Sequence, residues 1–212
     1  RNHSSAASDV YKRQHHEGLV RLVAKQEDLR PFLQQEVDGL PPVGTPPSGQ
    51  PIQPASFIYD RYFHGPRFQS HGGVLRGSGD GGSPGIDGVA LMRHQLPATD
   101  QFALEKDGER VLLEALPMLI EAGFQNAGLV AMETLGYSSL PVGIAWSTML
   151  RVPESDEALR LRTLQREHRE DGTTVHDVLI VGEDDAPVLA LKGLQLKAMG
   201  RVEEDQRFSM ER

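Results

Sequence analysis

Glu121 and Gln125 are the residues of this sequence whose types and spacing most directly suggest chemistry. They lie four positions apart in a long apolar stretch, and side chains with that spacing share one face of an α-helix. A carboxyl group at the mouth of a buried helix loses solvation, which favours its protonated form and lets it donate a proton at neutral pH. Gln125 would hold that carboxyl group in place or hydrogen-bond a substrate oxygen. The alternative is that Glu121 is an ordinary exposed helix residue.

Other groups of polar side chains give weaker indications of a functional site. His15 and His16 form an adjacent pair, Asp184 and Asp185 lie in a predicted turn, and residues 167–171 form a charged strand end. Such groups usually face solvent, so no metal site is predicted. The sequence contains no cysteine, which excludes a thiolate metal site, a cysteine nucleophile and a disulfide framework.

A long helix must position Glu121 and Gln125. The spacing of apolar residues predicts this helix over residues 112–132, with Pro117 in its first turn and Gly136 as its end. A shorter helix is expected to begin at Ser56, which is a plausible N-cap.

Strands are predicted on both sides of the long helix, from short apolar runs bounded by turn residues. The run over residues 142–152 alternates cleanly between larger apolar and smaller or polar residues, which predicts one buried face. The predicted strands cover residues 68–75, 85–94, 142–152, 158–169, 173–181 and 187–199. One central helix beside a mostly antiparallel sheet is an α+β arrangement.

The last predicted strand changes phase along its length. Leu189 and Leu191 share one phase, whereas Leu194 and Leu196 share the other. A bulge near Gly193 would allow both pairs to point inward.

Four segments resemble landmarks of one family, the dehydratase domains of polyketide synthases. The first (YFHGPRFQ) resembles the opening of the second hotdog of such a domain, the second resembles the start of its central helix, and the others resemble two of its strands. In chain order they are residues 62–69, 116–125, 140–144 and 191–194. The resemblance covers about residues 56–200, with the four landmarks in the family's order.

The resemblance implies a hotdog fold, as the second half of a double hotdog. Domains of this family remove water from a (3R)-3-hydroxyacyl group held on the phosphopantetheine arm of an acyl carrier protein, with no other cofactor, and give a trans-2-enoyl thioester. The first hotdog supplies a histidine that removes the α-proton, and the second supplies an acid that protonates the leaving hydroxyl. Glu121 and Gln125 stand at the positions of the acid and its partner. The resemblance also places five residues near the substrate, namely His64, Gly65, Pro66, Phe68 and Phe124.

Three positions depart from the family pattern. Glu121 stands where Asp is usual, and small misplacements of a catalytic group can cost about a hundredfold in rate. Leu116 stands where His is usual. His64 stands where many relatives carry Tyr, and it would bond to the acid or line the substrate path, or else be a packed turn residue.

The catalytic histidine of the first hotdog is missing. Its pattern in the family is His-x-x-x-Gly-x-x-x-x-Pro, and no histidine of this sequence satisfies it. His168 is followed by Gly172 at the right spacing, but Asp177 replaces the proline. We therefore expect the chain to be inactive alone.

The N-terminal part differs in composition from the rest. Residues 4–14 (SSAASDVYKRQ) resemble translated sequencing-adaptor read-through, as found at the ends of environmental gene fragments; the alternative is an ordinary polar N-terminus. If the adaptor interpretation holds, the natural protein continues upstream. The expected organisation is an extraneous or disordered segment, a remnant of the last strand of the first hotdog, a proline-rich linker, the second hotdog and a polar tail. In this order they cover residues 1–14, 15–27, 28–55, 56–202 and 203–212.

Three functions remain open at this point. The chain is half of a dehydratase, or a non-catalytic acyl-binding or structural hotdog of a megasynthase, or a stand-alone thioesterase or hydratase dimer. If the chain is half of a dehydratase, its expected partners are the upstream hotdog, an acyl carrier protein and a second copy of the parent synthase. A half domain should also expose the apolar surface that meets the other hotdog, which favours dimerisation or aggregation.

Composition narrows the possible partners and location. The net charge of −8 argues against nucleic acid, which is bound through clustered Lys and Arg. No apolar run approaches the roughly 20 residues of a membrane span, and no signal peptide opens the sequence. A cytoplasmic protein is therefore expected.

Overall fold

The computed structural model describes residues 52–77, 83–91, 103–106, 109–112, 115–154, 157–183 and 185–203. The adaptor-like segment, the strand remnant, most of the proline-rich linker and most of the polar tail lie outside the described residues. Residues 92–94 of the second predicted strand and Asp184 also lie outside them.

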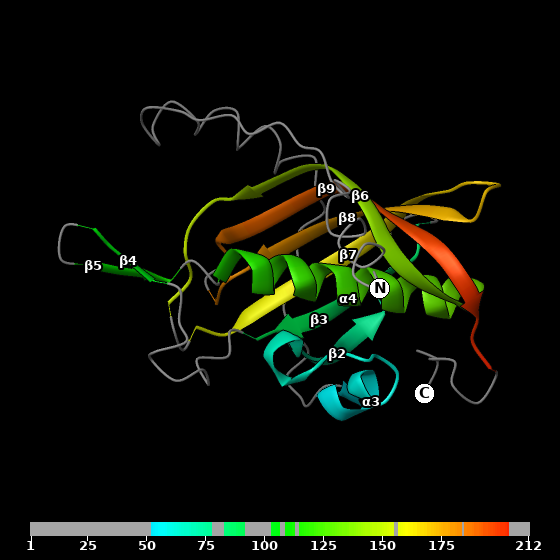
Figure 1. Cartoon of the computed structure of the whole chain (residues 1–212), viewed down its shortest axis with the longest axis horizontal. Coiled ribbons are helices and arrows are strands. Elements are labelled where there is room, and N and C mark those ends of the chain that lie inside the picture. The colour runs from blue at the N-terminus through cyan, green and yellow to red at the C-terminus, as the bar shows by residue number, and fades with distance from the viewer. Residues whose placement is uncertain are drawn as a thin grey trace, which may run out of the picture.

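The described chain forms one long helix and a large antiparallel sheet (Figure 1). In chain order the elements are β1 (Gln53–Pro54), α3 (Ala55–Tyr59), the 3₁₀ turn η2 (Pro66–Phe68), β2 (His71–Gly77), β3 (Gly85–Ala90), β4 (Ala103–Lys106), β5 (Glu109–Leu112), α4 (Ala115–Leu135), β6 (Tyr137–Met149), β7 (Leu159–His168), β8 (Thr173–Val181) and β9 (Pro187–Arg201). The sheet has the strand order β1-β2-β3-β7-β8-β9-β6, and β4 pairs separately with β5. The predicted α+β architecture is confirmed.

Helix α4 lies across one face of the sheet, and β6 and β9 curve around its C-terminal end (Figure 1). Gly136 ends the helix as predicted: it has a φ of +68° and its N–H donates to the Met132 carbonyl. The start of the predicted helix was wrong, because Leu112 ends strand β5 and α4 begins at Ala115. The β4–β5 hairpin was not predicted.

Further boundaries differ from the prediction, and the strand predicted over residues 142–152 is β6, which runs from Tyr137 to Met149. Ser56 is not an N-cap, because Pro54 occupies the N-cap position of α3 and no side chain caps it. The strand predicted from residue 68 begins at His71, because Pro66 starts the η2 turn. A proline fixes its own φ near the helical value and therefore suits the first position of such a turn.

The bulge predicted in β9 is confirmed. Gly193 has a φ of +62°, and between the pairs His176–Leu194 and Val178–Leu191 one residue of β8 lies opposite two residues of β9. The leucines on both sides of the bulge are buried in the core beneath α4, as their change of phase required. These leucines are Leu189, Leu191, Leu194 and Leu196.

The single buried face predicted for residues 142–152 was wrong. Ile144 and Met149 pack against the core beneath α4, whereas Trp146 packs on a separate cluster formed by Leu179, Val181 and Ala190. Strand β6 pairs with β9 across the bulge at Gly193, so the phase of β6 changes together with that of β9. The bulge of one strand thus determines which β6 side chains face the helix.

A buried network of hydrogen bonds connects α4 to strands β2, β3 and β7. The Nδ1 atom of buried His71 accepts the Gly73 N–H at 3.1 Å, so the ring hydrogen lies on Nε2 and donates to Asn126 Oδ1 at 2.9 Å. The Asn126 amide nitrogen donates to the Ile86 carbonyl and to Thr163 Oγ1, both at 2.9 Å. His71 is therefore neutral and fully hydrogen-bonded at both ring nitrogens.

Two buried histidines should make the chain less stable below neutral pH. Burial lowers the pKa of His71 to about 4 and that of His176 to about 3, from an ordinary value of 6.5. Between pH 6.5 and pH 5 the unfolded chain binds protons that the folded chain does not. The free energy of unfolding should therefore fall with falling pH, by up to about 1.4 kcal/mol per pH unit for each histidine.

Urea denaturation at pH 6.5, 5.75 and 5.0 measures this slope. His176→Gln should reduce the slope to about half, whereas His168→Gln, at the exposed end of β7, should leave it unchanged. A free energy of unfolding that stays constant over this range would contradict the account.

No helix in the described part of the chain has the length and apolar character that a membrane-spanning helix requires.

Candidate active site

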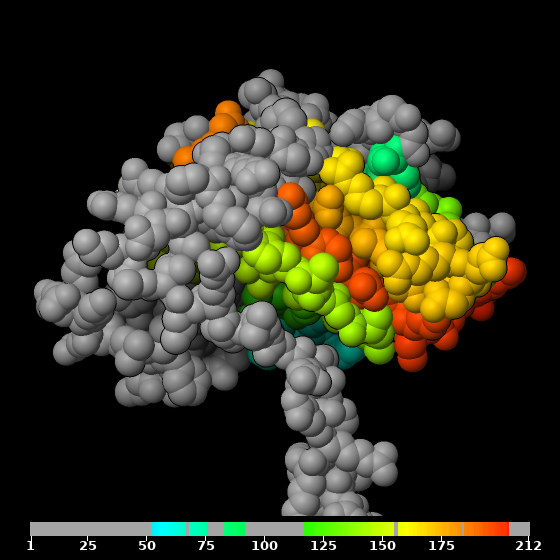
Figure 2. Space-filling model, turned by 90° about the horizontal axis from the view of Figure 1, so that it is seen from above, coloured from blue at the N-terminus to red at the C-terminus, as the bar shows by residue number. Residues whose placement is uncertain are grey.

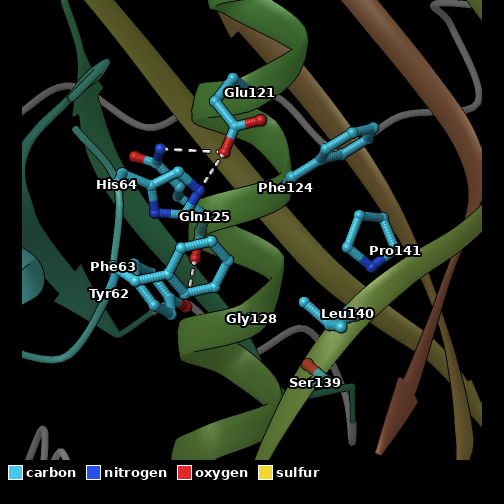
Figure 3. Close-up of a pocket in the computed structure, with 10 residues that line it drawn as sticks. All are labelled: Tyr62, Phe63, His64, Glu121, Phe124, Gln125, Gly128, Ser139, Leu140 and Pro141. Carbon is cyan, nitrogen blue, oxygen red and sulfur yellow. Dashed lines mark hydrogen bonds and ion pairs between the residues drawn. The ribbon is translucent and has the colours of Figure 1, made fainter. Parts of the chain in front are cut away.

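A pocket of about 200 Å³ lies where α4, the loop after α3 and the first half of β6 meet (Figure 3). Its lining residues are Tyr62, Phe63, His64, Glu121, Phe124, Gln125, Gly128, Ser139, Leu140 and Pro141. The four helix residues have the spacing i, i+3, i+4 and i+7, so they share one face of α4. The pocket thus combines a single helix face with two segments that are far apart in the sequence.

The Glu121 carboxyl group has one occupied and one open oxygen. Its Oε1 atom lies 2.8 Å from His64 Nε2 and accepts the Gln125 amide N–H at 3.0 Å. Oε2 has no hydrogen-bond partner among the described residues, and Figure 3 shows it pointing away from His64 and Gln125. The side chain is 21% exposed, so Glu121 is not the ordinary exposed helix residue that the alternative required.

Gln125 has its amide orientation fixed by three hydrogen bonds. The Tyr59 hydroxyl accepts the His71 N–H at 2.6 Å, so its own hydrogen donates to Gln125 Oε1 at 2.8 Å. The amide nitrogen therefore faces the other way, and its two hydrogens go to Glu121 Oε1 and to the Phe68 carbonyl, the latter at 2.7 Å. Gln125 is a permanent donor to the carboxyl group of Glu121.

Two aromatic rings contact the His64 imidazole. The Phe63 ring stacks on the imidazole with centroids 5.1 Å apart, and the Tyr62 ring meets it edge-on at 5.6 Å. These contacts direct Nε2 at Glu121. Nδ1 is buried and has no hydrogen-bond partner among the described residues.

Tyr62 forms one wall of the pocket because Gly128 makes room for it. The Tyr62 hydroxyl donates to the Gln125 backbone carbonyl at 2.9 Å, and a Cβ on residue 128 would collide with this hydroxyl. Burial, and secondarily the nearby Glu121 carboxyl group, raises the pKa of this hydroxyl. Tyr62 therefore stays protonated and serves as an anchor.

Gly128→Ala should destabilise the chain and displace Tyr62. Alanine is favoured over glycine in a helix interior by about 1 kcal/mol, but overpacking typically costs about 1–3 kcal/mol. Because the added Cβ collides directly with the Tyr62 hydroxyl, we expect a cost in the upper part of that range and a net loss of about 1–2 kcal/mol. Denaturation with urea measures it. Adding Tyr62→Phe removes the colliding hydroxyl and should recover part of the loss.

Gly143→Ala is the matched control, because a Cβ there meets no atom within 4 Å. A Gly128→Ala chain as stable as the wild type would show that Tyr62 is not confined by the helix.

The predicted site residues divide into two groups. His64, Glu121, Phe124 and Gln125 line the pocket. Gly65 and Pro66 do not, because they are exposed and turn the chain into η2. Phe68 contributes its backbone carbonyl to Gln125, while its side chain is 47% exposed and outside the pocket.

Several lining residues were not predicted as site residues. Gly128 could have been predicted from the sequence, because it continues the helical spacing from Glu121 through Gln125. Residues 139–141 of β6 also line the pocket. They could not have been predicted, because their position depends on how β6 curves around α4. Tyr59, which orients Gln125, carries no sequence signal of that role.

Among the residues that the structure describes, no three His, Asp or Glu side chains are grouped as metal ligands would be.

No family model and no curated protein matches the sequence. Solved structures match it at low identity. The dehydratase domain of a mycocerosic acid synthase-like polyketide synthase is 14% identical, with 74% of this chain and 55% of that chain covered and a TM-score of 0.51. The dehydratase domain of RzxB from Pseudomonas fluorescens is 16% identical (68% and 48% covered, TM-score 0.47). The protein smu.793 from Streptococcus mutans UA159, bound to acetyl CoA, is 13% identical (68% and 95% covered, TM-score 0.44).

The likeness to the first of these structures shows the fold. The chain has the hotdog fold that dehydratase domains of polyketide synthases also have, as the sequence resemblance predicted. The chain matches only about half of that dehydratase domain.

Proposed function

We propose that this chain is the acid-bearing half of a dehydratase that removes water from a (3R)-3-hydroxyacyl thioester. The observation that carries the proposal is the Glu121 carboxyl group, which faces a pocket with one oxygen fixed by His64 and Gln125 and the other open. The thioester would be carried by an acyl carrier protein of a polyketide or polyunsaturated fatty acid synthase. A cytoplasmic location and a dimeric parent synthase are part of the same proposal.

The reaction needs a base and an acid. A base removes the proton from Cα, the electron pair forms the Cα–Cβ double bond, and the Cβ–O bond breaks. Hydroxide is a poor leaving group, so the Glu121 carboxyl group donates its proton to the departing oxygen, which leaves as water. Glu121 is then a carboxylate, and the base carries the α-proton.

The rest of the pocket suits an acyl chain. Phe63, Phe124 and Leu140 give apolar walls beside the carboxyl group. Apolar walls with a few placed polar groups are typical of small-molecule sites. They would hold the alkyl part of the substrate while its hydroxyl group meets Glu121.

The base would come from a partner. Of the described histidines, His71 and His176 are buried in the core, His168 lies at the exposed end of β7, and His64 is bonded to the acid itself. None of them faces the open oxygen of Glu121 from across the pocket. We therefore propose that a second hotdog supplies the histidine base.

The edge formed by β6 is where we place that second hotdog. Strand β6 pairs only with β9 among the described strands, and Figure 2 shows it at the surface beside the end of β9. Apolar side chains are exposed around the pocket on this side: Phe63 at 87%, Leu140 at 42% and Val142 at 52%. A partner hotdog at this edge would cover these side chains and close the pocket.

Mass spectrometry of a (3R)-3-hydroxyacyl pantetheine thioester tests the proposal. We expect enoyl product from the chain extended at its N-terminus by a first hotdog with a histidine base, and none from the chain alone. Turnover by the chain alone would show that two copies, or an unrecognised base, complete the site. If the extended and folded protein gives no product, the chain is an acyl-binding or structural hotdog instead.

A further inference from the structure

We infer that His64 is a positioning residue for Glu121: its imidazole donates from Nε2 to the carboxyl group and stabilises the carboxylate that proton transfer leaves behind. The inference rests on the proposed function. It follows from the geometry around Oε1 and from the surroundings of the imidazole ring.

Oε1 of Glu121 receives donors from two separate elements. Gln125 reaches it from the next turn of α4, and His64 reaches it from the loop before η2. Hydrogen bonds to an ionised carboxylate are shorter and stronger than those to a neutral group. Both contacts therefore strengthen as Glu121 loses its proton, which lowers the energy of the transition state more than that of the ground state.

The surroundings of His64 favour the tautomer with the hydrogen on Nε2. Nδ1 is buried without a partner among the described residues, so a hydrogen on this atom would be a buried donor with no acceptor. A lone pair on Nδ1 avoids that cost and leaves the single ring hydrogen on Nε2, 2.8 Å from Glu121 Oε1. The ring contacts with Phe63 and Tyr62 keep the imidazole in this orientation.

The length of Glu121 matters for the contact. An aspartate at position 121 would draw the carboxyl group back by one methylene, away from a 2.8 Å contact that His64 cannot follow while its ring stays stacked. Glu121→Asp should therefore break the His64 contact. His64→Phe should then cost little more in that background than Glu121→Asp alone, which a double-mutant cycle detects as non-additivity.

The kinetic test uses the chain extended by the first hotdog. His64→Phe should lower kcat about ten- to a hundredfold, the effect of one charge-assisted hydrogen bond, with KM little changed. His64→Gln places an amide N–H near the position of Nε2 and should restore most of the activity. If His64→Phe keeps wild-type kcat, or if His64→Gln is as impaired as His64→Phe, the inference is overturned.

A second test does not depend on turnover. Imidazole ¹⁵N NMR of the chain itself at pH 8, with the His64 signals assigned by their loss in His64→Gln, should show the tautomer with its hydrogen on Nε2. Glu121→Leu, which removes the acceptor, should shift these signals. A hydrogen on Nδ1, or signals unchanged by Glu121→Leu, would overturn the inference and leave the proposed function standing. If the spectra are as expected but the extended protein gives no enoyl product, the His64–Glu121 contact stands and the proposed function fails.

Discussion

Glu121→Gln should lower the rate of dehydration by about a hundredfold to ten-thousandfold, the range over which general acid catalysis contributes. The amide has the shape of the carboxyl group, and its oxygen can still accept from His64 and Gln125, but it has no acidic proton to give to the leaving oxygen. Substrate binding should change little, so the loss should appear in kcat. Steady-state formation of the enoyl thioester by the chain extended with the first hotdog measures it.

Glu170→Gln is the control for this variant, because Glu170 lies in the exposed turn between β7 and β8. It removes the same charge and should leave both kcat and KM unchanged. A Glu121→Gln protein that retains more than about a tenth of wild-type kcat would mean that the acid lies elsewhere.

Asn126→Leu should destabilise the fold by about 3 kcal/mol or more, because each buried polar group left without a partner costs about 1–3 kcal/mol. Leucine has a similar size but removes three hydrogen bonds at once: those to His71 Nε2, the Ile86 carbonyl and Thr163 Oγ1. The buried N–H of His71 would then have no acceptor. Urea denaturation followed by circular dichroism gives the free energy of unfolding.

Ser138→Ala provides a comparison, since it also removes a hydrogen bond, from Ser138 Oγ to the Gly200 carbonyl at 3.2 Å, but at an exposed position. It should change the free energy of unfolding by less than about 0.5 kcal/mol. If Asn126→Leu costs no more than Ser138→Ala, the network between α4 and the strands does not hold the helix in place.

The strands behind the site were predictable because their side chains alternate with a period of two residues. Strands β7, β8 and β9 begin and end within two residues of the predicted positions, and the phase change of the leucines was enough to predict the bulge at Gly193. Strand β6 was not predictable in detail, because its phase follows a bulge in its neighbour. Local periodicity carries no information about such a partner.

The candidate site was predictable only in part, for a similar reason. The spacing of Glu121 and Gln125 on one helix is local, so the sequence shows it. The hydrogen bond of Tyr59 to Gln125 joins residues 66 positions apart, and that of His71 to Asn126 joins residues 55 positions apart. Contacts of this kind arise from packing of segments that no single-sequence pattern brings together.

The central claim is that Glu121 protonates the leaving group, and a change of leaving group tests it most directly. Chloride departs as an anion without taking up a proton, so a 3-chloroacyl pantetheine thioester needs the base but not the acid. The wild-type and Glu121→Gln forms of the extended protein are compared on the 3-hydroxy and 3-chloro substrates, after subtraction of the uncatalysed elimination. Our account predicts that Glu121→Gln loses about a hundredfold or more on the hydroxy substrate and almost nothing on the chloro substrate. An equal loss on both substrates would contradict it and give Glu121 a role in binding or structure instead.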